Sequence, residues 1–251
     1  MKTRYQEFKP SPRFSSHIEC FWCHRTADRE PAHRVLPDGC MDIIFEKSPN
    51  KVGAAALRIV GAMTRAQSFV IPPQHVTFGV RFHPAMAARM LRVAGKEIVD
   101  GILTLEDVWG AAVARRLHEQ LEECTSPVEF IAQLENALGE PPAPDPIEKS
   151  VAWLVQSRGQ VPVEELADAA SLSPRQFRRV CFERAGLTPK HLARILRFHN
   201  AAMHAVAPRR NDWAQLALDC GYYDQAHFIN EFREFTGVAP VEFASASPPS
   251  A

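Results

Sequence analysis

The stretch from Val161 to Pro240 contains the same short unit twice, and this repeat restricts the fold more than any other part of the sequence. Each copy has a Leu-Ala pair, a turn, a phenylalanine, a glycine and a proline, in that order. Leu166 and Leu216 are 50 positions apart, whereas the phenylalanines, glycines and prolines are each 51 apart, so the second turn holds one extra residue. Two copies of a helix, a tight turn and a helix predict a device that reads a DNA groove twice.

The length and composition indicate a soluble protein with two domains. The chain has 251 residues, of which 46% are hydrophobic and 23% are charged, values typical of globular proteins. The start, Met1 to Glu7, has no apolar core and therefore predicts no secretory signal. No run reaches the ~18 apolar residues of a membrane helix. We expect a bacterial cytoplasmic, nucleoid-associated protein with six reduced cysteines.

The net charge is zero, but the positive charge is concentrated in one segment. Between Ser171 and Arg210 the acidic residue is Glu183, so nine basic residues leave a charge of +8 there. The nine are Arg175, Arg178, Arg179, Arg184, Lys190, Arg194, Arg197, Arg209 and Arg210. A solvated helix face would mix lysine with glutamate, so this pattern favours phosphate binding.

The order of patterns along the chain predicts an α+β protein of two domains. Residues 1–140 would form the first domain: a polar lead-in to about residue 14, short strands from His17 to His83, and helices beyond Pro84. The strands suggest a small β-barrel or sandwich. The expected helices there are 85–91, 105–124 and 126–138, the last with a capping box at Ser126 and Glu129. A proline-rich linker would occupy 141–146, an all-α domain 147–244 and a disordered tail 245–251.

The second helix of each unit carries the candidate DNA contacts. Helices are expected at 150–158, 163–170, 173–185, 189–205, 212–220 and 224–236, with Phe177 and Phe228 facing the core. In the first unit Arg175, Arg178 and Arg179 point outward, and arginine donates bidentately to guanine. In the second unit the matching residues suit adenine edges and thymine methyl groups; they are Gln225, Ala226, Ile229 and Asn230. Phosphate contacts are predicted at Ser173, Lys190, Arg197 and His227.

The doublet resembles the AraC/XylS family of bacterial transcription regulators. The resemblance rests on residues 166–167, 171–179 and 186–189, and most strongly on 221–228 with 232–233, 235–237 and Pro240. It implies two helix-turn-helix units, joined by the helix 189–205, that enter successive major grooves of double-stranded DNA. RNA polymerase is then an expected partner. Ile229-Asn230 departs from the serine-arginine pair that members often have, so the second unit lacks a cation.

The front half is similar to the cupin-like sensory domains of many AraC-type regulators, through its Leu-Pro-Asp-Gly stretch at 36–39. On the strand 76–82 the valines and phenylalanines take one face and leave Arg81 and His83 on the other. With Arg34 and Asp38 they form the candidate site for an anionic small-molecule effector. If that face meets solvent, Arg81 has no such role. The apolar stripes of the helices between Leu105 and Leu138 predict a homodimer.

The cysteines allow other interpretations. Cys20, Cys23 and His24 match the haem-attachment pattern C-x-x-C-H, which requires export, and core packing explains them better. Zinc bound by these residues with Cys40 is an alternative, although Cys20 and Cys23 would lie on opposite faces. Another is a cysteine-based DNA alkyl-transfer protein or metal sensor, and a third is a helical adaptor that binds no DNA. We predict no enzyme, cofactor or metal.

Overall fold

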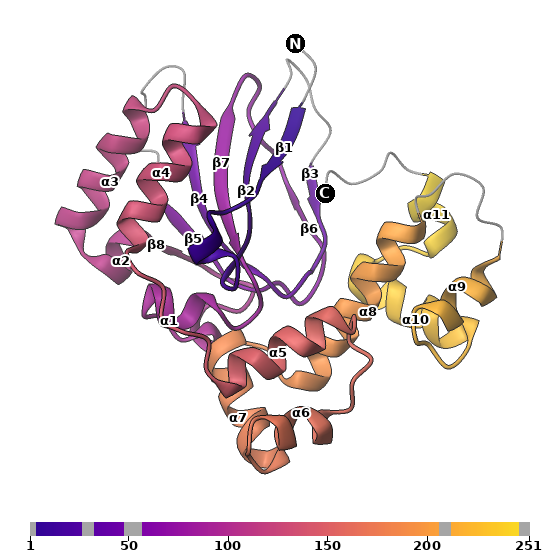
Figure 1. Ribbon diagram of the computed structural model, residues 1–251. Coiled ribbons are helices and arrows are strands. Elements are labelled where there is room, and N and C mark those ends of the chain that lie inside the picture. Colours follow the sequence, from indigo (N-terminus) through magenta and orange to yellow (C-terminus); the bar gives the residue numbers. More distant parts are fainter. Residues whose placement is uncertain (1–3, 27–32, 48–56, 206–211, 246–251) are drawn as a thin grey trace.

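The computed structural model describes residues 4–26, 33–47, 57–205 and 212–245 (Figure 1). An amino-terminal domain with two sheets precedes a carboxyl-terminal domain made of helices. The expected disordered tail 245–251 is wrong at Ser245, which ends the helix α11 (Pro240–Ser245). Its remaining residues, 246–251, and Arg209 and Arg210 fall outside the described residues. No helix of the described segments is long and apolar enough to cross a membrane.

The larger sheet is open rather than closed into the expected barrel, so the cupin-like detail is not confirmed. Its order is β1-β2-β7-β4-β5-β8, and every neighbouring pair is antiparallel. The strands are β1 (Arg4–Phe8), β2 (Ile18–Arg25), β4 (Met41–Lys47), β5 (Arg58–Val60), β7 (Val76–Phe82) and β8 (Ile102–Thr104). Strands β3 (His33–Val35) and β6 (Gln67–Phe69) form a separate pair.

Strand β1 corrects the expectation that residues 1–14 form only a lead-in. Its register places Tyr5 opposite His24, and the Tyr5 ring lies 6.2 Å from that of Trp22. Apolar and polar residues alternate only weakly along β1, which lies at the edge of the sheet. The strand is therefore defined by its pairing with β2 and not by a pattern in its own sequence.

The two faces of the sheet differ in chemistry, as the alternation of β7 predicts. Phe78, Val80 and Phe82 are buried on one face, where the Phe78 ring stacks on Phe130 at 4.5 Å. Arg81 lies on the other face, opposite Cys20 of β2, and Trp22 of β2 lies opposite Gly79. A Cβ atom at Gly79 would lie 2.2 Å from the Trp22 ring, so glycine lets the indole cross β7.

Four helices cover the apolar face of the sheet and its lower end (Figure 1). They are α1 (Ala87–Leu91), α2 (Leu105–Trp109), α3 (Ala111–Glu123) and α4 (Pro127–Leu138). The single helix expected at 105–124 is wrong, because Gly110 adopts φ 81° and breaks it. The helix expected at 85–91 begins only at Ala87, because Ala85 has φ 68°.

Two expectations for α3 and α4 also change. Ser126 Oγ accepts from Glu129 N at 3.3 Å, but the Glu129 carboxylate accepts from Thr125 N at 2.7 Å, so the reciprocal capping box is wrong. The apolar stripes are buried within the chain: Leu117, Leu121, Phe130 and Leu134 are at most 2% exposed. On the same helices Val113 is 37% exposed and Val128 is 72% exposed, so only part of the apolar surface of α3 and α4 is covered within the chain.

The carboxyl-terminal domain has seven helices within the described residues. They are α5 (Pro146–Gln156), α6 (Val163–Ala169), α7 (Pro174–Ala185), α8 (Pro189–Ala205), α9 (Trp213–Asp219), α10 (Gln225–Thr236) and α11 (Pro240–Ser245). Helix α5 begins four residues before the expected Ser150, because Asp145 and Glu148 form a capping box around Pro146. The proline-rich segment therefore ends in a helix cap.

The two domains pack against each other through apolar and charged contacts. Leu36, Ala62 and Ala85 of the first domain join the core of the second. The buried carboxylate of Glu148 accepts from Arg89 of α1 at 2.7 Å, and the same arginine lies 3.6 Å from the Asp145 carboxylate at the start of α5. Ala66 N donates to Phe235 O of α10 at 2.8 Å. The amino-terminal domain thus contacts both repeated units.

A substitution of Gly95→Ala is expected to loosen this docking. Gly95 begins the 3₁₀ helix η2 (Gly95–Glu97), and a Cβ atom there would lie 2.2 Å from the carbonyl oxygen of Arg184. Backbone atoms cannot yield as a flexible side chain does, so η2 and α7 must separate. Hydrogen exchange measured by mass spectrometry should become faster in peptides that cover η2 and the end of α7.

Gly101→Ala is the matched control, since its Cβ would lie 3.4 Å from the nearest neighbour, the carbonyl oxygen of Ile98. Equal exchange in both variants would contradict the expected loosening.

Candidate nucleic-acid interface

The first unit consists of α6, a turn and α7, held together by local chemistry and a buried core. Ser173 caps α7: its hydroxyl accepts from Gln176 N at 3.3 Å, and the Gln176 side chain accepts from Ser173 N at 3.1 Å. Ser173 and Gln176 thus form a capping box. Leu166 and Ala167 of α6 are fully buried, as is Phe177 of α7. The support helix therefore fixes the orientation of α7.

The outward face of α7 is cationic. Arg175, Arg178 and Arg179 are all exposed, and none forms an ion pair with another residue of the described segments. Phe182 lies among them at 41% exposure, seven residues after Arg175 and four after Arg178. Sequence reasoning missed Phe182, although helical spacing from the two arginines could have placed it on this face.

The second unit repeats the scaffold with different outward residues. Asp224 caps α10 by accepting from His227 N at 2.7 Å, and the buried Phe228 stacks on Trp213 of α9 at 6.3 Å. The predicted contacts divide into two groups: Gln225, Ala226 and Asn230 are exposed, whereas Ile229 is half-buried against the core. Ile229 is therefore less available for a base contact than its position in the sequence suggested.

The nine basic residues of the predicted cationic segment have different roles in the structure. Four are exposed: Arg175, Arg178, Arg179 and Lys190. Three bond within the protein: Arg184 to Asp145, Arg194 to Glu231 at 2.7 Å, and Arg197 to Gly159 O at 2.9 Å. Arg209 and Arg210 are not described. The positive charge available at the surface of the described residues is therefore smaller than the +8 that the sequence of this segment suggests.

The predicted phosphate contacts also separate. Ser173, Lys190 and His227 are exposed, and the His227 ring lies 3.9 Å from the Glu231 carboxylate. Arg197 is half-buried, and its Nη1 donates inward to Gly159 O. It stabilises the turn after α5 instead of lying on the surface beside Lys190.

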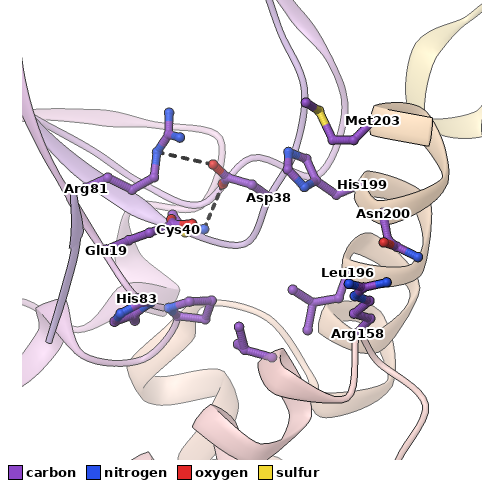
Figure 2. A pocket seen from close by; sticks show the side chains of 12 residues that line it. Glu19, Asp38, Cys40, Arg81, His83, Arg158, Leu196, His199, Asn200 and Met203 are labelled. Atoms are coloured by element: carbon purple, nitrogen blue, oxygen red, sulfur yellow. Dashed lines mark hydrogen bonds and ion pairs between the residues drawn. The ribbon is translucent and has the colours of Figure 1, made fainter. Parts of the chain in front are cut away.

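Three of the four candidate effector residues gather at the domain boundary (Figure 2). Arg81 Nε lies 3.4 Å from Asp38, and His83 lines the same cavity. Arg34 lies elsewhere: it donates to Thr236 O and sits over the Phe243 ring at 5.9 Å, at the end of the second unit. The structure thus assigns Arg34 to domain docking.

Asp42 joins this cluster, although sequence reasoning did not select it. It lies 3.6 Å from Arg81 Nε and accepts from Trp22 Nε1 at 2.8 Å. Burial raises the pKa of Asp42 to about 6, against the opposing effect of Arg81. Burial lowers the pKa of Arg81, but the carboxylates of Asp42 and Asp38 outweigh it and leave this pKa raised. Burial also lowers the pKa of His83.

The cysteines do not have the environment of reactive thiols. Cys20, Cys23 and Cys40 are buried and free. Burial raises the pKa of Cys20 to about 12 and raises that of Cys23 and Cys40, whereas a nucleophilic thiol needs a lowered pKa. Cys20 lies opposite Arg81 on the polar face of the sheet, whereas Cys23 belongs to the apolar core. The two cysteines therefore lie on opposite faces, as predicted. Among the residues with described positions, no three potential ligands gather around a metal site.

Comparison with known proteins separates the two domains. Residues 166–246 match a family described as a helix-turn-helix domain, and residues 6–104 match a domain of unknown function, DUF6597. An uncharacterized HTH-type transcriptional regulator of Haemophilus influenzae is 27% identical over 93 residues, which are 37% of this chain and 31% of that protein. The chain therefore spans about a third of the relative's length.

Solved structures similar to the chain include a domain of the global transcriptional factor AdpA. The DNA-binding domain of AdpA, solved with a target DNA, is 26% identical and covers 41% of this chain and 93% of its own, with a TM-score of 0.38. ToxT of Vibrio cholerae is 11% identical and covers 97% of this chain and 96% of its own, with a TM-score of 0.42.

Proposed function

We propose that this chain, whose residues 166–246 form an AraC-type helix-turn-helix domain, is a sequence-specific transcriptional regulator that responds to a small-molecule effector. The observation that carries the proposal is the pair of capped helices α7 and α10, each with an exposed row of side chains able to contact bases. Helix α8 joins the two units, and its 17 residues span roughly 25 Å. This length suits recognition helices about one DNA turn apart, ~34 Å.

The two units are proposed to read different bases. Arg175 and Arg178 would donate to guanine, while Gln225 and Asn230 would read adenine edges. Ala226 would meet a thymine methyl group. Lys190, with the helix starts at Ser173 and Asp224, would hold phosphates. The first unit then supplies most of the electrostatic affinity and the second adds discrimination.

The amino-terminal domain is proposed to sense the effector and to transmit its presence through the domain contacts. The cluster of Asp38, Arg81 and His83 lies where that domain meets α8, so a ligand there would touch both domains. Contacts with RNA polymerase and with a second copy of the chain, in the bacterial cytoplasm at the nucleoid, complete the proposal.

Selection of sites from random double-stranded DNA with the intact chain tests this function. We expect a bipartite site with a guanine-rich part and an A/T-rich part about one turn apart, bound with a log K that falls linearly with log salt, by about 0.9 for each phosphate contacted. Failure to enrich any sequence, or binding independent of salt, would contradict a DNA reader and favour a helical adaptor. One base preference in both parts would contradict the division between units.

A further inference from the structure

A cavity of about 220 Å³ lies between the polar face of the sheet and helices α5 and α8. Figure 2 shows residues of the amino-terminal domain, including Glu19, Asp38 and Arg81, on one side and Arg158 and Leu196 on the other. The volume is below the ~300–1,000 Å³ typical of sites for drug-sized ligands. A ligand that fits this volume would be a small molecule, and it would touch both domains.

The amino-terminal wall of the cavity has an excess of carboxylates. Arg81 lies 3.4 Å from Asp38, which lines the cavity with it, and 3.6 Å from Asp42, which lies outside the lining, so two acids face one guanidinium. Glu19 adds a third carboxylate; it accepts a hydrogen bond from the Cys40 thiol at 3.4 Å and makes no ion pair with the described residues. A cationic group of a ligand would neutralise the excess negative charge of this wall.

The opposite wall of the cavity carries a positive charge, on Arg158, and apolar side chains. Arg158 follows the end of α5 with φ 54°, and its backbone N donates to Val155 O at 2.9 Å, which fixes the turn. Its guanidinium is exposed and makes no ion pair within the described part of the chain. An unpaired guanidinium suits a carboxylate, which it can bind with two parallel hydrogen bonds. Leu196 and Met203 of α8 supply apolar surface beside it.

We propose that this cavity binds a short ω-amino acid, with an ammonium group at one end and a carboxylate at the other. The ammonium group pairs with Glu19 and Asp38, and the carboxylate pairs with Arg158. The methylene chain lies along Leu196 and Met203. The two charges are placed at opposite ends of the ligand because the carboxylates and Arg158 belong to opposite walls of the cavity (Figure 2). This assignment gives the proposed effector response a ligand class, and its consequence for DNA rests on that proposed function.

A ligand that joins the two walls stabilises the docked arrangement of the domains. In that arrangement Arg178 of α7 and Asn230 of α10 are exposed, so the docked sensor covers neither reading residue. Ligand and DNA can therefore bind together. Because coupling between two binding sites is reciprocal, a ligand that holds the two units in place raises the affinity for DNA.

Calorimetric titration of the intact chain with 4-aminobutanoate, 5-aminopentanoate and 6-aminohexanoate tests the site. At least one should bind, and the analogues with one charged group, pentylamine and pentanoate, should bind at least about 10-fold more weakly. Glu19→Gln and Arg158→Gln should each weaken binding at least about 10-fold. Glu119→Gln and Arg116→Gln, exposed on α3 and remote from the cavity, are the matched controls and should bind as the original chain does.

Three results would overturn the assignment: none of the three ω-amino acids binds, a one-charge analogue binds as tightly, or Arg158→Gln binds unchanged. Fluorescence anisotropy with a selected DNA site separates this inference from the proposed function. If the chain binds one of the ω-amino acids but no DNA, the proposed function is contradicted and the proposed ligand site still stands. A chain that binds DNA but no probe contradicts the site. Bound probe that leaves the DNA affinity unchanged contradicts the coupling.

Discussion

The double replacement of Arg175 and Arg178 by alanine is expected to lower the affinity of the chain for its selected DNA site by at least about 30-fold. Each arginine that donates to a base contributes about 1–3 kcal/mol, and both side chains are exposed on α7 without an internal ion pair among the described residues. Fluorescence anisotropy at several salt concentrations gives the affinity. It also gives the salt slope, which should become shallower by about 0.9 for each phosphate that the variant no longer neutralises.

The matched control replaces Arg115 and Arg116, which are exposed on α3 at a distance from the reading helices. This variant loses the same charge and should keep its affinity within about 3-fold, since charges beyond a Debye length are screened. An equal loss in both variants would contradict base contact by α7 and leave only a general charge effect.

Replacement of Gln225 and Asn230 should reduce discrimination between sites more than affinity for unrelated DNA.

The change Phe177→Ala is expected to lower the free energy of unfolding by about 3–5 kcal/mol. Phe177 is 0% exposed in the core that α6 and α7 share with α8, so its removal leaves a cavity as well as a loss of apolar burial. Urea unfolding followed by circular dichroism measures the change. Because α7 needs this contact for its orientation, the variant should also bind DNA more weakly.

Phe182→Ala is the matched control, because Phe182 is on the same helix and is 41% exposed. Its removal should cost less than about 1 kcal/mol of unfolding free energy. Similar losses for both phenylalanines would contradict the assigned packing of α7.

Local chemistry made the carboxyl-terminal helices predictable from the sequence. Ser173 and Asp224 cap α7 and α10 through bonds three residues along the chain. Gly186 and Gly237 end the same helices at φ 73° and 79°. Caps and glycine stops act over one helical turn, so the order of residues suffices to define them. The amino-terminal domain was harder to predict, because the edge strand β1 has no strong pattern of its own.

By itself the sequence determined the doubled unit, its caps, its inward phenylalanines and the position of its outward arginines, because each depends on neighbours within a few residues. Only the tertiary structure decided that the large sheet stays open and that Arg184, Arg194 and Arg197 bond within the protein. It alone brought Glu19 and Arg158 to one cavity. These features join residues far apart in the chain, and such contacts depend on how whole elements pack rather than on any local pattern.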